Sequence, residues 1–196
     1  MGECQSSILI TAPHGNQSGC DEMEDPLSHD IAKKMTAILR TRGYCVCLHS
    51  GKGKLGRRTV DYNRPEVMYT NYGRKFINHL QGAKCHVDIH SFSDTIPWGD
   101  GKSIVVLSHN TDSNFERIFM DYIRRKTKFN VIRYLASNIN ALTYTSYSQN
   151  IPSILLEFPY TKNTKKLKNK HDCCFQVEPG LIETAADALQ FTVKSL

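Results

Sequence analysis

The sequence predicts a three-layer α/β/α fold with a mainly parallel, mixed sheet. Short apolar runs typical of buried strands alternate along the chain with longer segments in which apolar residues recur at helical spacing. Such alternation is characteristic of strands joined by crossover helices that cover both faces of a sheet. The chain has 196 residues, a length that suits one domain, and it shows no internal repeat or linker. We therefore expect residues 1–196 to form a single domain.

The first part of the chain reads as a strand, a helix and a second strand. The apolar run at 7–11 ends in a turn sequence at 12–15. Apolar residues then recur at helical spacing over 26–42, with a proline in the first turn and a glycine after the end, the usual start and stop signals of a helix. The apolar run at 44–48 predicts the next strand.

The rest of the chain continues the alternation after a loop rich in Gly and Arg. Pro65 can open a helix whose apolar stripe runs over 67–80. Further strands are predicted at 85–89, 104–107, 131–135 and 153–158, and further helices at 112–126 and 179–196.

The charge balance indicates the kind of partner. The chain carries 25 Lys and Arg residues against 19 Asp and Glu, a formal net charge of +6, which favours anionic partners. The densest basic stretch, 162–170, contains five lysines but no aromatic residue on which bases could stack. We therefore expect a small anionic substrate rather than nucleic acid. No apolar run approaches the ~18 residues of a membrane span, so none is expected.

The cysteines indicate the compartment. Seven cysteines form no Cys-x-x-Cys pair, and the first residues lack the apolar core of a signal peptide. We therefore expect reduced thiols and a cytoplasmic location.

Two apparent motifs do not fit the chemistry they suggest. The sequence at 101–103 looks like the end of a phosphate-binding P-loop, but a strand rather than a helix is predicted to follow it. His86 and His90 are four residues apart, as in a helical metal pair, yet they lie in a β-branched apolar run. On a strand, His86, Asp88 and His90 share one face.

Four polar clusters lie where predicted strands end or are interrupted. They are His14 after the first strand, residues 61–64 after the basic loop, residues 88–91 at a strand end, and Glu157 inside an apolar strand. Ligands of open α/β sheets bind beyond the carboxyl ends of the strands. An acid in an apolar strand is costly to bury unless it is paired or functional. These clusters are therefore the candidate functional residues.

Together the clusters resemble the zinc-dependent N-formylglutamate amidohydrolases, a group within the superfamily of zinc carboxypeptidases, aspartoacylases and N-acetylmuramoyl-alanine amidases. Residues 11–15 are similar to the family's Pro-His-Gly opening, residues 60–65 to its Asp-x-Asn-Arg motif, and residues 88–92 to its Asp-x-His-Ser motif. The motifs occur in the family's order and span about residues 8 to 160. The resemblance implies a zinc-carboxypeptidase-like fold and a hydrolase.

The resemblance also implies a zinc ion held by two histidines and one carboxylate, with water in the open position. His14 and His90 match the histidines. Carboxypeptidases and aspartoacylases place a Glu three residues after the first histidine, where this chain has Gln17. The muramoyl amidases place a Glu just before the first helix, so the resemblance assigns Glu24 as the third ligand. The alternatives for this ligand are Asp21, Glu22, Asp25 and His29.

The remaining roles follow from the same resemblance. Glu157 matches the catalytic glutamate, which takes a proton from the attacking water and passes it to the leaving nitrogen. Arg64, assisted by Asn63, would bind a substrate carboxylate through its guanidinium fork. Asp61 resembles the acid that orients the first histidine.

The function implied is hydrolysis of an amide bond next to a free carboxylate, as in an N-acyl amino acid or a small peptide. Arg57 or Arg58 would stabilise the oxyanion. Two alternatives remain open: a catalytically decayed binding module without metal, suggested by Gln17, and a basic nucleic-acid-binding protein that uses the loop at 162–170. Steeply salt-dependent binding would indicate the latter.

Overall fold

The computed structural model describes residues 8–14, 27–51, 61–93, 103–109, 113–138, 140–162 and 175–196. Its strands are β1 (Ile8–Ala12), β2 (Val46–Ser50), β3 (Cys85–Ser93), β4 (Ser103–Ser108), β5 (Asn130–Leu135), β6 (Ser153–Lys162) and β7 (Phe175–Val177). Its helices are α1 (Ser28–Thr41), α2 (Asn71–Leu80), α3 (Asn114–Lys126), α4 (Ala141–Ser148) and α5 (Leu181–Lys194), with a 3₁₀ helix η1 (Pro65–Tyr69) before α2.

The strands form one mixed sheet in the order β2-β1-β3-β6-β4-β5, with β7 paired to β6. The four strands β2, β1, β3 and β6 are parallel, so their carboxyl ends meet at one edge of the sheet. β4 and β7 run antiparallel to β6, and β5 is parallel to β4. The predicted α/β/α fold with a mainly parallel, mixed sheet is confirmed.

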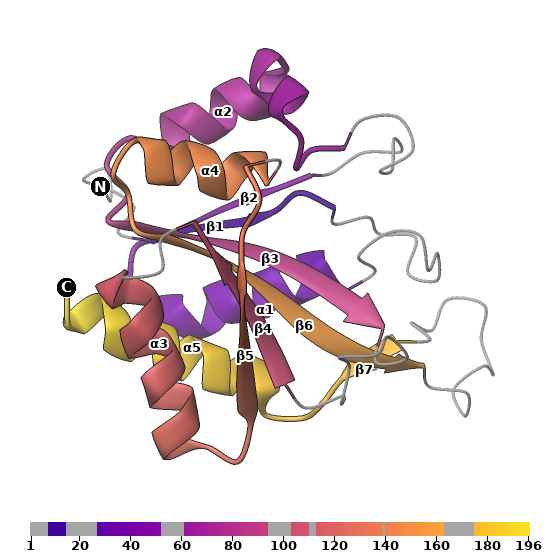
Figure 1. The fold of residues 1–196 in the computed structure, drawn as a ribbon, viewed down its shortest axis with the longest axis vertical. Helices are drawn as coiled ribbons and strands as arrows, with labels where there is room; N and C mark the ends of the chain where they lie inside the picture. Colours follow the sequence, from indigo (N-terminus) through magenta and orange to yellow (C-terminus); the bar gives the residue numbers. More distant parts are fainter. Residues whose placement is uncertain are drawn as a thin grey trace.

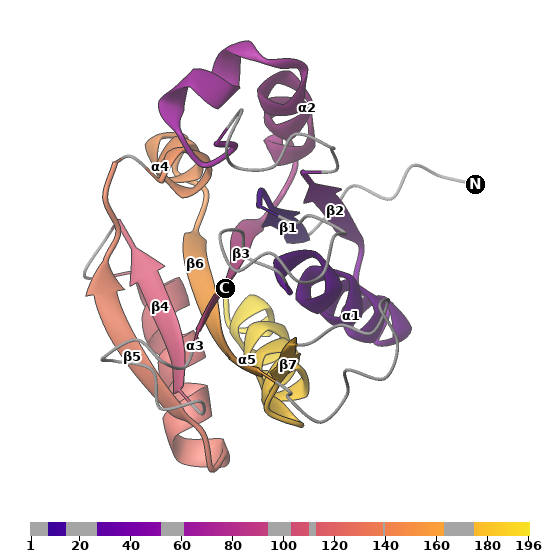
Figure 2. The same cartoon turned by 90° about the vertical axis from the view of Figure 1, so that its right-hand side faces the viewer.

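Helices cover both faces of this sheet. Figures 1 and 2 show α2 and α4 on one side and α1, α3 and α5 on the other. Alternate side chains of each strand enter different cores, as period-2 strands require. Ile10 of β1 and Val87 of β3 pack into the core beneath α1, α3 and α5, whereas Leu9 packs with Phe76 and Leu142 beneath α2 and α4.

Most predicted elements are present, with shifted ends. Ser103 is the first residue of β4, so a strand and not a helix begins here, as predicted. The helix predicted at 67–80 is divided instead, because Thr70 interrupts it and its hydroxyl accepts a hydrogen bond from the backbone of Gly73, at 3.3 Å. α4 and β7 are not predicted. α4 has the sequence ALTYTSYS, which is poor in strong helix formers, and β7 is three residues long.

The cysteines correct one expectation. Cys45 is disulfide-bonded, whereas Cys47 and Cys85, the other cysteines in the described part of the chain, are not in a disulfide. The prediction of reduced thiols is wrong at Cys45, because spacing along the chain does not reveal which cysteines the fold brings together. The cytoplasmic location stays a prediction. No helix in the described ranges is long and apolar enough to cross a bilayer.

Candidate metal and substrate site

Segments far apart in the sequence meet at the edge where the parallel strands end. His14 lies in the turn after β1, and His90 lies near the end of β3. Both side chains are buried, and their ring centroids are 4.8 Å apart with the ring planes at 82°. The two predicted histidine ligands are therefore neighbours in space.

Each of these histidines is bound by a carboxylate at the same ring nitrogen. His14 Nε2 lies 2.7 Å from Asp61 Oδ1, and His90 Nε2 lies 3.1 Å from Asp88 Oδ2. A carboxylate at Nε2 favours the proton on that atom and leaves Nδ1 as the basic nitrogen of the neutral ring. Carboxylates commonly hold metal-binding histidines in this way.

Both carboxylates are held in their charged form. Burial acts to raise the pKa of Asp61, but hydrogen bonds from His14 and from the Asn63 backbone, with the charge of Arg64, outweigh burial and lower it to about 2. Burial likewise opposes ionisation of Asp88, and the charge and hydrogen bond of His90 outweigh it, so that the pKa of Asp88 is lowered. The two acids therefore act as hydrogen-bond acceptors at neutral pH.

The loop that carries Asp61 is fixed from several sides. Its acid accepts a hydrogen bond from the Asn63 backbone at 2.9 Å. The ring of Tyr62 stacks on Tyr72 of α2, with centroids 4.4 Å apart and planes 4° from parallel. The Asn63 carbonyl accepts a bond from the first residue of α4, Ala141, at 3.3 Å. These contacts attach the loop to both helices of this face.

A close approach of backbones fixes the turn that carries His14. The Gly51 N–H donates to the Ala12 carbonyl at 2.9 Å. A Cβ at position 51 would lie 2.3 Å from the Pro13 carbonyl oxygen and 2.8 Å from the Tyr62 ring. Only glycine fits between the turn and the Tyr62 loop without displacing one of them.

Asn63 lies beside His90. Its side chain is buried, with Nδ2 at 3.3 Å from His90 Nε2. Its Oδ1 is also buried and finds no hydrogen-bond partner among the described residues. Because the proton of His90 lies on Nε2, the amide oxygen of Asn63 rather than its nitrogen suits this contact, and turning the amide over gives Oδ1 a donor within the site.

Arg64 is engaged through one side of its guanidinium. Nε lies 3.2 Å from Asp61 Oδ2, and the side chain is 37% exposed. This contact uses Nε alone, and the two terminal Nη groups form the end-on fork that matches a carboxylate. Arg64 is thus bound to Asp61 and is also partly exposed to solvent.

Glu157 stands beside His90 across two adjacent strands. The two residues are register partners in the β3–β6 pair, so their side chains leave the same face of the sheet. Ile154, Leu156 and Phe158 point to the opposite face and are fully buried. Leu155, on the same face as Glu157, is buried as well, whereas Glu157 itself is half-buried rather than enclosed.

Several predicted site residues lie outside the described ranges. They are Gln17, Asp21, Glu22, Glu24, Asp25, Arg57 and Arg58. His29, an alternative ligand, is buried on α1. Within the ranges that the structure describes, no group of three or more His, Cys, Asp or Glu side chains is placed to hold a metal ion.

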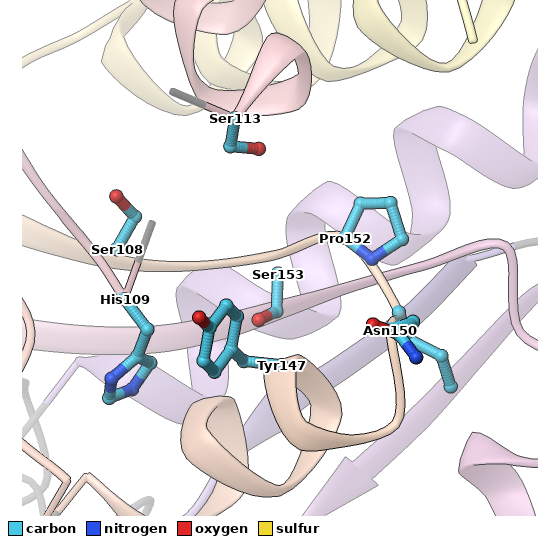
Figure 3. A pocket seen from close by; sticks show the side chains of 8 residues that line it. Ser108, His109, Ser113, Tyr147, Asn150, Pro152 and Ser153 are labelled. Atoms are coloured by element: carbon cyan, nitrogen blue, oxygen red, sulfur yellow. The ribbon is translucent and has the colours of Figure 1, made fainter. Parts of the chain in front are cut away.

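A separate pocket lies at the other edge of the sheet, where β4 ends and β6 begins (Figure 3). It has a volume of about 200 Å³. Its described lining consists of Ser108, His109, Ser113, Tyr147, Asn150, Ile151, Pro152 and Ser153. None of the predicted site residues is among them, and the described lining contains no carboxylate.

Solved structures match nearly the whole chain, although no protein-family model and no curated protein does. The gene product Atu2144 from Agrobacterium tumefaciens matches with a TM-score of 0.68 and 12% identity, over 98% of this chain and 91% of that one. The catalytic domain of CwlV, an N-acetylmuramoyl-L-alanine amidase from Bacillus (Paenibacillus) polymyxa var. colistinus, matches with a TM-score of 0.52 and 18% identity, over 97% of each chain.

A metallo-carboxypeptidase from Burkholderia cenocepacia also matches, with a TM-score of 0.52 and 15% identity, over 98% of this chain and 57% of that one. The chain has a zinc-carboxypeptidase-like fold. Identities this low show the fold alone, and the fold is one that amidases and carboxypeptidases share.

Proposed function

We propose that this chain is a zinc-dependent hydrolase, similar to the N-formylglutamate amidohydrolases, that cleaves an amide bond next to a free carboxylate. Its substrates would be N-acyl amino acids or small peptides. The observation that carries the proposal is the pair His14 and His90, with ring centroids 4.8 Å apart and a carboxylate on Nε2 of each.

The donor set of this pair suits zinc. Two neutral imidazoles, each oriented by an acid, are typical first ligands, and both would bind through Nδ1. The bound ion would lower the pKa of a water molecule toward ~7 and polarise the scissile carbonyl.

Glu24 is proposed as the third ligand, with Asp21, Glu22 and Asp25 as alternatives. The described chain resumes at Leu27, whose N–H donates to Ser91 Oγ at 3.4 Å, next to His90 in sequence. Three residues of chain span at most about 10 Å. A carboxylate at position 24 is therefore within reach of the histidine pair.

Glu157 would be the general base and then the general acid. Its register position beside His90 puts its carboxylate on the face of the sheet that carries the histidine. From there it would take the proton of the attacking water and deliver it to the leaving nitrogen. A half-buried acid remains accessible to water, as this role requires.

Arg64 and Asn63 would bind the substrate. The Nη fork of Arg64 would hold the free carboxylate in a bidentate pair, and Asn63 would assist it. Asp61 would orient both His14 and Arg64, since it contacts each. Arg57 or Arg58 would stabilise the oxyanion of the intermediate.

The experiment that tests this proposal is hydrolysis by the zinc-loaded protein. N-formyl- and N-acetyl-glutamate should be cleaved, and their α-amides, which lack the free α-carboxylate next to the scissile amide, should be cleaved much more slowly. Protein that binds zinc but hydrolyses none of these compounds would indicate the decayed binding module. Protein that binds DNA or RNA with steep salt dependence, and no zinc, would indicate the nucleic-acid alternative.

A further inference from the structure

A chain of buried polar side chains connects α4 to the proposed metal site. Ser146 Oγ on α4 lies 2.8 Å from His86 Nδ1, and His86 Nε2 lies 2.8 Å from Thr11 Oγ1. The Thr11 hydroxyl donates to Asp88 Oδ1. The other oxygen of Asp88 accepts from His90 Nε2. The side groups of Ser146, His86, Thr11 and Asp88 are fully buried.

The direction of each hydrogen bond follows from the chemistry of the groups. A charged Asp88 accepts only, so the single proton of the Thr11 hydroxyl goes to Asp88 and its oxygen accepts from His86 Nε2–H. His86 Nδ1 then accepts from the Ser146 hydroxyl at 2.8 Å, and it competes for that proton with the Leu142 carbonyl, at 3.1 Å. Burial lowers the pKa of His86 to about 4, so the ring is neutral at pH 7, with the one donor and one acceptor that the chain requires.

The side chains around this series of hydrogen bonds are apolar. His86 packs against Phe76, with ring centroids 5.3 Å apart, and the core beneath α2 and α4 contains Leu9 and Leu142. Apolar side chains would fill this layer at a lower desolvation cost. A hydrogen-bonded network in which every polar group has a partner fixes one arrangement of its side chains. This network ends at Asp88, so we infer that Asp88 is the side chain whose position it fixes.

We propose that Thr11, His86 and Ser146 are positioning residues for metal binding: they hold Asp88 so that it fixes the ring of His90. They contact neither metal nor substrate themselves. The Asp88 carboxylate can rotate about its side-chain bonds, so the hydrogen bond donated to Oδ1 fixes where Oδ2 meets His90. The inference depends on the proposed function for the presence of a metal. The hydrogen bonds from Ser146 to Asp88 can nevertheless be measured in metal-free protein.

Zinc affinity of the full-length protein, measured by competition with a chromophoric chelator, tests this role. Thr11→Val keeps the shape of the side chain and removes the hydroxyl, and we expect zinc affinity to fall by about 10- to 100-fold. Thr11→Ser restores a hydroxyl and should recover affinity to within about threefold of the wild type. The matched control is Thr192→Val, because Thr192 is equally buried but donates to the Ala188 carbonyl on α5, at 2.7 Å. It should lose stability without losing zinc affinity.

Nitrogen-15 NMR of the histidine rings in metal-free protein provides the second readout. His86 should be a neutral Nε2–H tautomer, and Thr11→Val should change the ring signals of both His86 and His90. Unchanged zinc affinity in folded Thr11→Val protein, or an Nδ1–H tautomer of His86, would overturn the proposal.

Two further outcomes are distinguishable. If wild-type protein binds no zinc, the proposed function fails. The ring signals of the wild type and of Thr11→Val then still decide whether the hydrogen bonds from Ser146 to Asp88 orient His90. If Thr11→Val does not fold, Ser146→Ala removes only the far end of the chain. It should shift the His86 tautomer equilibrium and weaken zinc binding several-fold, and no change in either would contradict the inference.

Discussion

Asp61 binds His14 through one carboxylate oxygen, with Oδ1 at 2.7 Å from Nε2. Its other oxygen lies 3.2 Å from Nε of Arg64. One acid therefore connects the proposed metal ligand to the proposed carboxylate fork, and its pKa of about 2 keeps it charged. Metal binding and substrate binding should both depend on this side chain.

Asp61→Asn tests that connection. The amide keeps the size of the carboxylate but loses its charge, so the His14 ring and the Arg64 guanidinium both lose their anionic partner. We expect zinc affinity to fall by about 10- to 100-fold and KM for carboxylate substrates to rise. Chelator competition and steady-state kinetics measure the two effects. Asp187→Asn, which removes a surface partner of Arg42, is the control and should change neither.

Arg64→Lys tests the carboxylate fork. The variant keeps the positive charge but loses the planar bidentate donor pair, so KM for N-acyl amino acids should rise by about tenfold or more while kcat falls less. The α-amides of the same compounds should show little change, because they offer no α-carboxylate to the fork. If KM for the free acids is unaffected, the fork belongs to another residue, and Arg57 and Arg58 are the next to examine.

Glu157→Gln tests the proton transfer. The amide preserves size and some hydrogen bonding but cannot accept the proton of the attacking water. We expect kcat to fall by about 10²–10⁴-fold, with zinc content and melting temperature little changed. Normal turnover by zinc-loaded variant protein would refute the catalytic role. A large loss of stability would indicate instead that Glu157 is a structural acid.

The buried histidines predict an acid-sensitive fold. Burial lowers the pKa values of His86 and His49 from 6.5 to about 4. Between pH 6.5 and pH 4 the unfolded chain binds more protons than the folded one, so the free energy of unfolding decreases as the pH falls. For His86 the loss from pH 7 to pH 5 should be about 2 kcal/mol. Urea unfolding of metal-free protein at the two pH values measures it.

The substitution His86→Gln separates this effect from other titrations. The variant should be less stable at pH 7, since it disturbs the chain from Ser146 to Thr11, but its stability should depend less on pH between 7 and 5. A pH dependence equal to that of the wild type would show that His86 is not the group responsible.

The sequence predicts the sheet well because its strands are apolar runs separated by clear turn signals. It does not predict α4, whose Ser, Thr and Tyr residues are weak helix formers and which is recognised as a helix only through its packing on β3 and β6. Glu157 is interpreted from the sequence as an acid in a buried strand. The structure confirms the buried strand, because residues 153–158 are buried except for Glu157, which is half-buried and in register with His90.

The residues of the candidate site can be predicted from the sequence only where they belong to short sequence motifs. His14, Asp61, Asn63, Arg64 and His90 are brought together, each from a short motif. The chain through Thr11, His86 and Ser146 could not be predicted, because it depends on the β1–β3 register and on the position of α4. Thr11 pairs in register with Asp88, and that alignment places the hydroxyl beside the carboxylate.

Zinc stoichiometry is the most direct test of the central claim. The experiment compares wild-type protein with His14→Ala and His90→Ala. Each protein is loaded with zinc and freed of excess metal, and its zinc content is measured by inductively coupled plasma mass spectrometry. The account predicts one tightly bound zinc ion per wild-type chain and its loss in both variants, with the fold retained. Wild-type protein without bound zinc, or variants that keep it, would contradict the account.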